Sequence, residues 1–387
     1  MKFCEDCGQS GWYHIASWAE GLAEVAFPSI SISEKFAKPI DSLMERAFSA
    51  LGLLRITSNF SRDEIPLRSR LVVEEAEKRG WSVKAFRGPA GFTGHFRMNK
   101  GSTWVRFDGL PVAEFSTEGN IGRIDDKQWI KRELSRMGFP VPQGRSFFFW
   151  QKKAAIEEGE RLGFPLVVKP RSGSVARHVT TAIRNKAELS IAIKKAVIYE
   201  PSCIVEKQIE GSVHRATVIY DRNVFVAKQK AAYVTGDGRS SIEQLIEAKN
   251  ARQNRSSDRR RLYHPLVADA EYLSEAGLSL SSILEKGKSA ELQRVPFMRF
   301  GGEFLNVSDV VHPDNRKLFI DIAEAFKLKV VGIDFIAPDI TVSWKDQICG
   351  VLELNAVPSI EIHQCPVEGV GQNVASSIMD MVEKYYD

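Results

Sequence analysis

The sequence predicts an α+β protein that contains at least two packed units. The chain has 387 residues, whereas a single hydrophobic core stops growing at roughly 250–300 residues. Its apolar fraction of 43% and charged fraction of 26% are ordinary for globular proteins and exclude disordered, collagen-like and low-complexity classes. Helical patterns alternate with short apolar strand patterns along most of the chain, which indicates both kinds of element in each unit.

The charge balance and the number of cysteines indicate the cellular compartment and the classes of binding partner. The chain carries 53 basic and 49 acidic side chains, a balance too mild to indicate nucleic-acid binding. No apolar run approaches the roughly 18 residues of a membrane span, and the N-terminus lacks the apolar segment of a secretory signal. Five cysteines, an odd number, suit a reducing compartment. We therefore expect a cytoplasmic protein with neither a nucleic-acid nor a membrane partner.

The first 65 residues give few signals beyond a helical pattern over 41–53. The next segment predicts a helix over 67–79 and a strand over 81–86, a step that fits a small α/β domain. A helix over 125–137 ends at the Gly-Phe-Pro-Val-Pro stretch 138–142, because proline cannot continue a helix. Beyond it we expect helices over 151–162, 187–199, 241–251, 312–327 and from 373, and strands over 166–169, 179–183, 203–206, 216–220, 223–230, 329–337 and 348–354.

Three oxygen-bearing side chains on the last two strands give the strongest chemical signal. Asp334 lies in one strand, and Glu353 and Asn355 point to the same face of the next because side chains alternate along a strand. The linker between these strands is short enough for a hairpin, which would place Asp334 opposite them. Two carboxylates and an amide oxygen suit Mg²⁺, a hard cation. The alternative is a polar, solvated sheet face.

Two lysines and one loop have the chemistry of a phosphate site. Lys127 stands at a helix start, and Lys169 ends an apolar strand just before Pro170. A lysine in such a place can hold phosphate oxygens as a point charge, although most lysines are solvated. The small residues of the loop 171–178 can cover phosphates with backbone N–H groups, or they form an ordinary turn. Glu206, at the end of a further strand, can accept from an adenine amino group.

In their order along the chain these residues resemble the ATP-grasp superfamily of carboxylate–amine ligases, most of all the ATP-grasp module of cyanophycin synthetase and of fused bacterial glutathione synthetases. The resemblance covers residues 121–387. The residues that carry it are Asp126-Lys127, Gly138-Phe139-Pro140-Val141-Pro142, Val168-Lys169-Pro170, Val205-Glu206, His214-Arg215, Gly236-Asp237-Gly238, Gly301-Gly302, His312-Pro313-Asp314-Asn315, Gly332-Ile333-Asp334-Phe335, and Glu353-Leu354-Asn355 followed by Pro358.

The resemblance implies an ATP-grasp fold with an N-terminal α/β substrate domain (1–122), a mobile central lid (123–205) and a C-terminal subdomain with the metal site (206–387). It implies that the chain binds ATP and two Mg²⁺ ions, with Mn²⁺ as an alternative to magnesium. The metal ligands that it implies are Asp334, Glu353 and Asn355, and the nucleotide contacts are Lys127, Lys169, Ser172, Gly173, Ser174, Glu206, Lys207, Ile209 and His214.

The implied activity is the joining of an amino acid or short peptide carboxylate to an amine through an acyl phosphate. Arg215 would lie near the transferred phosphate or the substrate carboxylate, and the backbone of Gly301 and Gly302 would lie near the acyl phosphate. A glutathione-type ligase that uses a γ-glutamyl dipeptide is one alternative. Val213 replaces an acid common in the family, which leaves a non-catalytic nucleotide-binding or RNA-binding module as another. A homodimer is one oligomeric state that the sequence leaves undecided.

Three further features keep more than one interpretation. Cys4 and Cys7 form one C-x-x-C pair, and His14 follows. A structural zinc site needs four ligands, and the other cysteines are scattered, so two ligands would have to come from elsewhere. The basic cluster 259–261 is either solvated or faces an anionic substrate. His363, just past the metal strand, is either a substrate contact or a packed core histidine.

Overall fold

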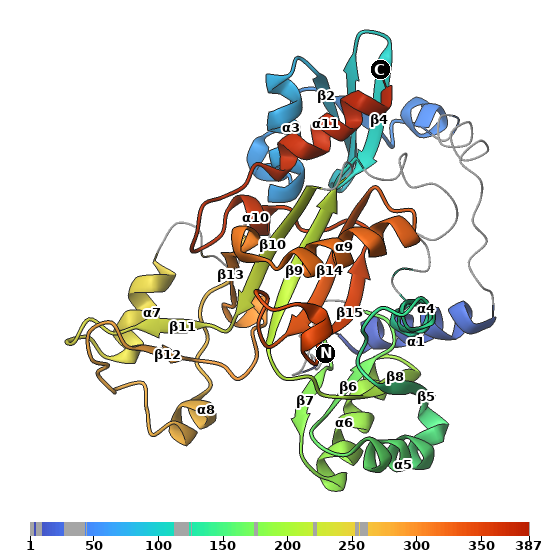
Figure 1. Cartoon of the computed structure of the whole chain (residues 1–387). Coiled ribbons are helices and arrows are strands. Elements are labelled where there is room, and N and C mark those ends of the chain that lie inside the picture. Colours follow the sequence, from blue (N-terminus) through green and yellow to red (C-terminus); the bar gives the residue numbers. More distant parts are fainter. Residues whose placement is uncertain are drawn as a thin grey trace.

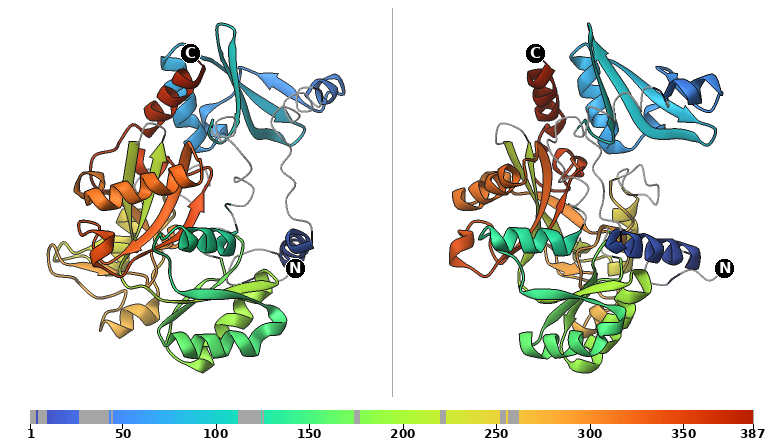
Figure 2. Two further views of the ribbon diagram at one scale, coloured as in Figure 1. Left: turned by 45° about the vertical axis from the view of Figure 1, so that its right-hand side comes forward. Right: turned by 90° about the vertical axis from the view of Figure 1, so that its right-hand side faces the viewer.

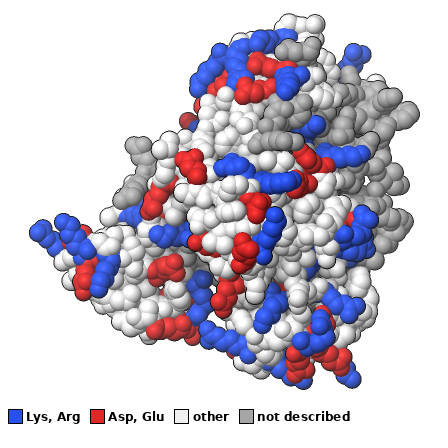
Figure 3. Space-filling model, viewed as in Figure 1, with Lys and Arg blue, Asp and Glu red and all other residues white. Residues whose placement is uncertain are grey.

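The computed structural model describes residues 4, 10–26, 43, 45–111, 124, 126–173, 177–219, 223–251, 255 and 262–386. These residues form four β-sheets with associated helices (Figure 1). No helix in these ranges combines the length and the apolar character that crossing a bilayer requires. On the face shown in Figure 3, basic and acidic side chains intermingle.

The central sheet has five antiparallel strands in the order β13-β10-β9-β14-β15. One face packs under helix α9, where Ala216, Ile333 and Phe335 share a core with Phe319 of the helix. Because side chains alternate, the residues between them, such as Asp334, point to the opposite face. The elements are β9 (Ser212–Ile219), β10 (Asn223–Lys230), β13 (Glu303–Asn306), α9 (Pro313–Ala325), β14 (Val330–Ala337) and β15 (Gly350–Asn355).

A second sheet, with four antiparallel strands in the order β5-β8-β6-β7, forms the unit that the sequence predicts as the lid. Val168 and Val205 from its strands share a core with Leu189 and Ile193 of helix α6. Figure 1 shows this unit below the central sheet, in green. Its elements are β5 (Gly144–Phe148), α5 (Lys152–Leu162), β6 (Leu166–Pro170), β7 (Thr180–Ile183), α6 (Lys186–Tyr199) and β8 (Ser202–Lys207).

Helix α4 (Lys127–Arg136) joins the two sheets. Its N-cap residue Asp126 accepts hydrogen bonds from the backbone N–H groups of Gln128 and Trp129, which fixes where the helix begins. The buried side chains Ile130 and Leu134 then pack into the core of the central sheet. The start of α4 is therefore held close to the strands that carry the predicted metal ligands.

The N-terminal unit is a four-stranded antiparallel meander, β1-β2-β3-β4, covered by α3. The last helix of the chain, α11, packs against the same core, where Ile378 and Val382 meet Phe96 and Val105 (Figure 1). Residues 65–110 and the last helix of the chain thus share one hydrophobic core. The elements are β1 (Arg55–Thr57), α3 (Leu67–Lys78), β2 (Ser82–Gly88), β3 (Gly91–Lys100), β4 (Thr103–Asp108) and α11 (Val374–Tyr386).

The remaining elements lie beside these units. Helix α1 (Gly11–Ala26) lies next to the second sheet, well away from the β1–β4 meander (Figure 2). A satellite of β11 (Tyr233–Thr235), α7 (Ile242–Asn250), α8 (Ala270–Glu275) and β12 (Ser289–Glu291) has its own small core. Helix α10 (Glu361–Gln364) follows the central sheet. The domain boundaries 122/123 and 205/206 stay predictions.

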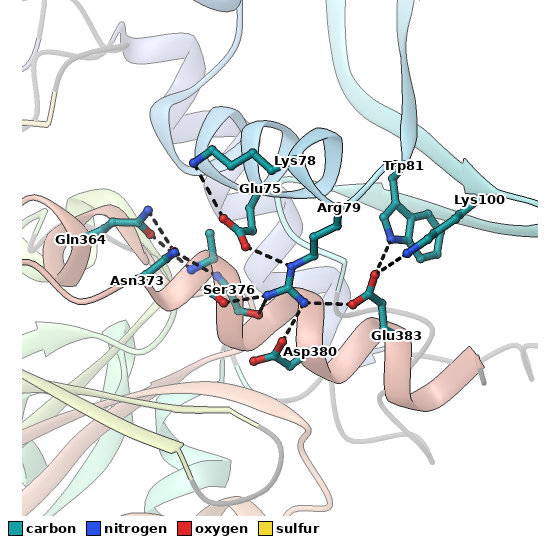
Figure 4. A network of polar contacts seen from close by, with 11 residues as sticks. Glu75, Lys78, Arg79, Trp81, Lys100, Gln364, Asn373, Ser376, Asp380 and Glu383 are labelled. Carbon is teal, nitrogen blue, oxygen red and sulfur yellow. Dashed lines mark hydrogen bonds and ion pairs between the residues drawn. The ribbon is translucent and has the colours of Figure 1, made fainter.

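Arg79 fastens α11 to the N-terminal unit (Figure 4). Its guanidinium donates to Asp380 at 2.7 Å and to Glu383 at 3.0 Å, both on α11, and to Glu75 of α3 at 3.0 Å. A further bond reaches the Ser376 hydroxyl at 2.7 Å. Only 19% of the Arg79 side chain is exposed, so these charge-assisted bonds are partly shielded from water.

Replacing Arg79 by Ala is expected to lower the free energy of unfolding by about 1–3 kcal/mol, because two acidic side chains of α11 lose a charge-assisted partner. Urea unfolding followed by circular dichroism measures the change. Arg136→Ala, at a side chain that is 70% exposed, is the matched control and should change stability by less than about 0.5 kcal/mol. Equal stability of Arg79→Ala and wild type would show that the apolar core alone holds α11.

Candidate active site

Two neighbouring strands carry the predicted metal ligands, and a third strand adds Arg215 to the same row. Asp334 of β14 lies opposite Arg215 of β9 on one side and opposite Glu353 of β15 on the other. Asn355 lies opposite Gly332, two residues along on the same face. The hairpin expected between β14 and β15 is therefore present, and it brings the two carboxyl groups and the amide together.

Gly332 leaves the space in which these side chains converge. A Cβ atom at this position would lie 2.9 Å from the Pro358 Cβ, closer than side chains approach each other. It would also lie 3.4 Å from the Arg215 Cδ and from the Asn355 Cβ. A side chain at residue 332 would therefore push apart the groups that form the row.

Burial opposes the negative charges of Asp334 and Glu353. Burial raises the pKa of Asp334 to about 7, and the adjacent Glu353 adds to this, although Arg215 opposes it. Arg215 donates to both oxygens of Asp334, with Nη2 to Oδ2 at 2.9 Å. Burial also acts against the charge of Glu353, but Lys127 and a hydrogen bond from Asp334 lower its pKa to about 2. Glu353 is therefore ionised at neutral pH, and burial works against the charge of Asp334 despite its pair with Arg215.

This donor set fits a divalent cation. Burial works against the negative charges of Asp334 and Glu353, so a bound cation would stabilise both carboxylates. The Asn355 Nδ2 atom is buried with no hydrogen-bond partner among the described residues, an unpaired polar group that a bound ligand would satisfy. Two carboxylates and an amide oxygen favour Mg²⁺ or Mn²⁺ over softer metals.

A buried lysine–glutamate cluster lies beside this row. Glu206 is 3% exposed and accepts from Lys169 Nζ at 2.7 Å and from Lys131 Nζ at 2.8 Å. Burial raises the pKa of Glu206, but the two lysines outweigh it and the pKa is lowered. Burial and the charge of Lys169 lower the pKa of Lys131, despite its pairing with Glu206. Two ammonium groups thus face one carboxylate, a surplus of positive charge that would attract an anion.

The cluster lines a small pocket that is closed too tightly in this structure to hold a free water molecule, so a ligand would have to widen it. Lys127, at the start of α4, also lines it; its Nζ lies 3.7 Å from the Glu353 Oε2 and donates to the carbonyl oxygen of Gly173. Charged groups at one side and apolar groups at the other suit a ligand with a phosphate tail and a flat base. The lining residues are Lys127, Ile130, Lys131, Pro142, Lys169, Ile204, Glu206, Val351 and Leu352.

The adenine contacts expected of Glu206 and Lys207 stay predictions. Each oxygen of the Glu206 carboxylate already accepts from one lysine and has capacity for a further donor. The Lys207 ammonium donates to the carbonyls of Gly163 and Phe164, and its backbone N–H donates to Gln143 at 2.8 Å. These bonds hold the end of β8 in place.

The other predicted nucleotide contacts that the structure describes do not line this pocket, and their roles stay predictions. His214 points to the face of β9 opposite Arg215, and burial, aided by Lys228, lowers its pKa to about 4. Ile209 is buried, and a Cβ at Gly350 would lie 3.0 Å from its Cδ1. The Ser172 backbone N–H donates to Glu200 at 2.6 Å. Ser174 and the basic cluster 259–261 lie outside the described residues.

Gly301 and Gly302 form a tight turn whose N–H groups are already bonded. Gly301 donates to the Met298 carbonyl at 2.8 Å and Gly302 to the Phe297 carbonyl at 3.1 Å. Gly301 has a φ of +91°, and a Cβ there would meet the Leu266 backbone at 2.6 Å. Packing therefore explains the glycine, and neither N–H is available for an acyl phosphate in this structure.

The sequence analysis did not identify Lys131 as a site residue, and it gave His363 two interpretations, a substrate contact or a packed core histidine. Lys131 stands four residues after Lys127, a spacing that places both on one face of a helix and could have revealed it. His363 is 1% exposed and shares a 2.8 Å hydrogen bond with the Thr217 hydroxyl. Burial and the nearby Arg215 lower its pKa to about 3, so it is neutral. Thr217 and Arg215 share a face of β9, which places His363 at the edge of the row.

Known proteins resemble the chain in both sequence and structure. Residues 143–237 match the family described as the D-ala D-ala ligase C-terminus. The crystal structure of a bifunctional glutathione synthetase from Pasteurella multocida matches with a TM-score of 0.64 at 21% identity, covering 84% of this chain and 45% of that one. This chain has an ATP-grasp fold. The fold that the sequence resemblance implies is thereby confirmed.

Two curated proteins with higher identity place this ATP-grasp chain among larger relatives. Cyanophycin synthetase from Crocosphaera subtropica is 33% identical over 324 residues, which is 81% of this chain and 36% of that protein. The glutathione biosynthesis bifunctional protein GshAB from Streptococcus mutans is 30% identical over 285 residues, which is 69% of this chain and 37% of that protein. The ATP-grasp chain thus spans little more than a third of the length of these relatives.

Proposed function

We propose that this chain is an ATP-dependent carboxylate–amine ligase. It would activate an amino acid or short peptide carboxylate as an acyl phosphate and release ADP and phosphate. The observation that carries the proposal is the row of Arg215, Asp334, Glu353 and Asn355 beside a buried lysine cluster with surplus positive charge. Phosphoryl transfer needs position and charge more than a nucleophilic side chain, and this arrangement supplies both.

In this proposal different residues of the pocket and the row would bind the phosphates, the base, the metal ion and the substrate. Lys127, Lys131 and Lys169 would hold the phosphate tail of ATP, and the apolar side of the pocket would hold the base. Asp334, Glu353 and Asn355 would hold Mg²⁺, which when bound neutralises charge on the phosphates. A cation beside Asp334 would compete with Arg215 for that carboxylate, so Arg215 would be freed to meet the substrate carboxylate or the transferred phosphoryl group.

The reaction would proceed in two steps. A carboxylate oxygen of the substrate attacks the γ-phosphorus, the new O–P bond forms, and the bond to ADP breaks. A neutral amine then attacks the acyl carbon, the C–N bond forms, and phosphate leaves with the electrons of the C–O bond. Negative charge builds on the acyl oxygen in the second step. Arg215 is the candidate donor for that oxygen, since the Gly301 and Gly302 N–H groups are already bonded.

A screen of ADP release with single amino acids and dipeptides, followed by mass spectrometry of the products, tests this proposal. ADP formation that requires both a carboxylate and an amine, with a product whose mass is that of the two substrates less one water, would support it.

A glutathione-type step is the second candidate, favoured by the 30% identity to the bifunctional protein GshAB. In that case a γ-glutamyl dipeptide would be the active acyl donor. Binding of ATP without turnover in any mixture would favour the non-catalytic alternative.

Lys131 provides a test of the phosphate site itself. Replacing Lys131 by Met is expected to weaken ATP binding about 10–100-fold, because one of the three lysines that line the pocket is lost. Isothermal titration with a non-hydrolysable ATP analogue measures the change. Lys153→Met, at a side chain that is 92% exposed, is the matched control. Unchanged affinity in Lys131→Met would mean that Lys131 serves only to pair with Glu206.

A further inference from the structure

A cluster of metal-ligating side chains lies outside the active site. One ligand atom each from Cys4, His14 and His178 lie within 4.8 Å of one another. The Cys4 Sγ is 3.6 Å from the His178 Nε2. The rings of His14 and His178 meet edge to face, with centroids 5.3 Å apart. Cys4 and His14 both lie near the N-terminus, whereas His178 is 174 residues from Cys4.

The orientation of His178 is that of a metal ligand. Its Nδ1 lies 2.9 Å from the carbonyl oxygen of Lys195. A carbonyl can only accept, so Nδ1 carries the proton and the lone pair of Nε2 points toward Cys4. Metal-binding histidines usually donate their second ring N–H to a carbonyl or carboxylate in this way. His178 is 1% exposed and has a left-handed backbone with a φ of +53°, an uncommon conformation for a non-glycine residue.

We propose that Cys4, His14 and His178 bind a Zn²⁺ ion. One thiolate and two imidazoles favour zinc over the hard cations that suit the carboxylate row. In the sequence, Cys7 follows Cys4 with the C-x-x-C spacing of zinc-binding pairs. Cys7 lies outside the described residues and is not part of the site proposed here.

The ion would fasten the N-terminal helix to the lid. Two other contacts already join them: Trp18 donates to the Val197 carbonyl at 2.9 Å, and Arg177 donates to the Tyr13 hydroxyl at 3.0 Å. Figure 2 shows α1 beside the lid sheet and away from the β1–β4 meander. This role is independent of the reaction proposed above.

Zinc content of the full chain tests the site. We expect the purified protein, incubated with ZnCl₂ and then dialysed, to retain about one zinc per chain. Cys4→Ser and His178→Gln should each lower zinc affinity by at least about 10-fold, measured by competition with a chromogenic chelator. Cys365→Ser, at an exposed free thiol, is the matched control and should bind zinc like wild type. Failure to retain zinc in the wild-type chain, or equal affinity in Cys4→Ser, would overturn the proposal.

A spectroscopic readout does not depend on the folding of any variant. The wild-type protein loaded with Co²⁺ should show the ligand-field bands of a tetrahedral site and a thiolate-to-cobalt charge-transfer band. Titration with ZnCl₂ should remove both. A spectrum typical of six oxygen ligands would place the metal at the carboxylate row instead and would contradict a thiolate site.

Discussion

Replacing Glu353 by Gln is expected to reduce ADP formation at least about 100-fold. Glu353 is the carboxylate of the row that stays ionised, with a pKa of about 2, and it lies 3.7 Å from Lys127. Gln keeps the size and one oxygen but removes the charge that a divalent cation and the phosphate-binding lysine both use. Asp334→Asn should act in the same direction, since it leaves Arg215 without its carboxylate partner. A coupled assay of ADP release, with the substrates found by the screen, measures both.

Glu285→Gln is the matched control for this experiment. The Glu285 side chain is 76% exposed and pairs only with a neighbouring lysine among the described residues, so the variant should turn over like wild type. Circular dichroism and ATP titration separate a lost reaction from a lost fold. If Glu353→Gln folds and turns over at the wild-type rate, Glu353 is not a metal ligand, and the row of side chains loses the role proposed here.

The parts of the site that lie close in sequence could be predicted from it. Strand alternation and a short linker were enough to expect Asp334 opposite Glu353, and the structure has that register. The same local reasoning missed β3 and β4, whose runs mix apolar, basic and glycine residues. A pattern within one strand also does not show that two lysines from other elements reach the Glu206 carboxylate, and the contact of Glu206 with adenine stays a prediction.

Long-range contacts explain what the sequence could not reveal. The sequence alone could not reveal that His178 lies beside Cys4, because the two residues are 174 positions apart and His178 lies in a loop between strands. Likewise, the apolar face of α11 indicates a helix that packs, but nothing in it indicates the β1–β4 meander as its partner. Such contacts depend on how the units pack together, and no periodicity within a single element encodes that packing.

Replacing Glu206 by Gln is expected to lower the free energy of unfolding by about 3–5 kcal/mol in the absence of nucleotide. Two buried lysines, Lys131 and Lys169, would lose the one carboxylate among the described residues that both contact, at 2.8 Å and 2.7 Å. Urea unfolding near neutral pH measures the loss. Glu160→Gln is the matched control, because Glu160 pairs with Lys186 at 3.0 Å but is 44% exposed. An exposed pair contributes at most about 1 kcal/mol.

The pH dependence gives the Glu206 prediction a second, independent readout. The pKa of Glu206 is lowered from its usual value of 4.5, so ionised Glu206 stabilises the fold above that pH. This contribution is lost as the pH falls through the lowered pKa, because the folded chain must then take up a proton that the unfolded chain already holds. The stability gap between wild type and Glu206→Gln should therefore narrow below about pH 4. A gap that stays constant between neutral and acid pH would show that Gln acts through packing rather than through the missing charge.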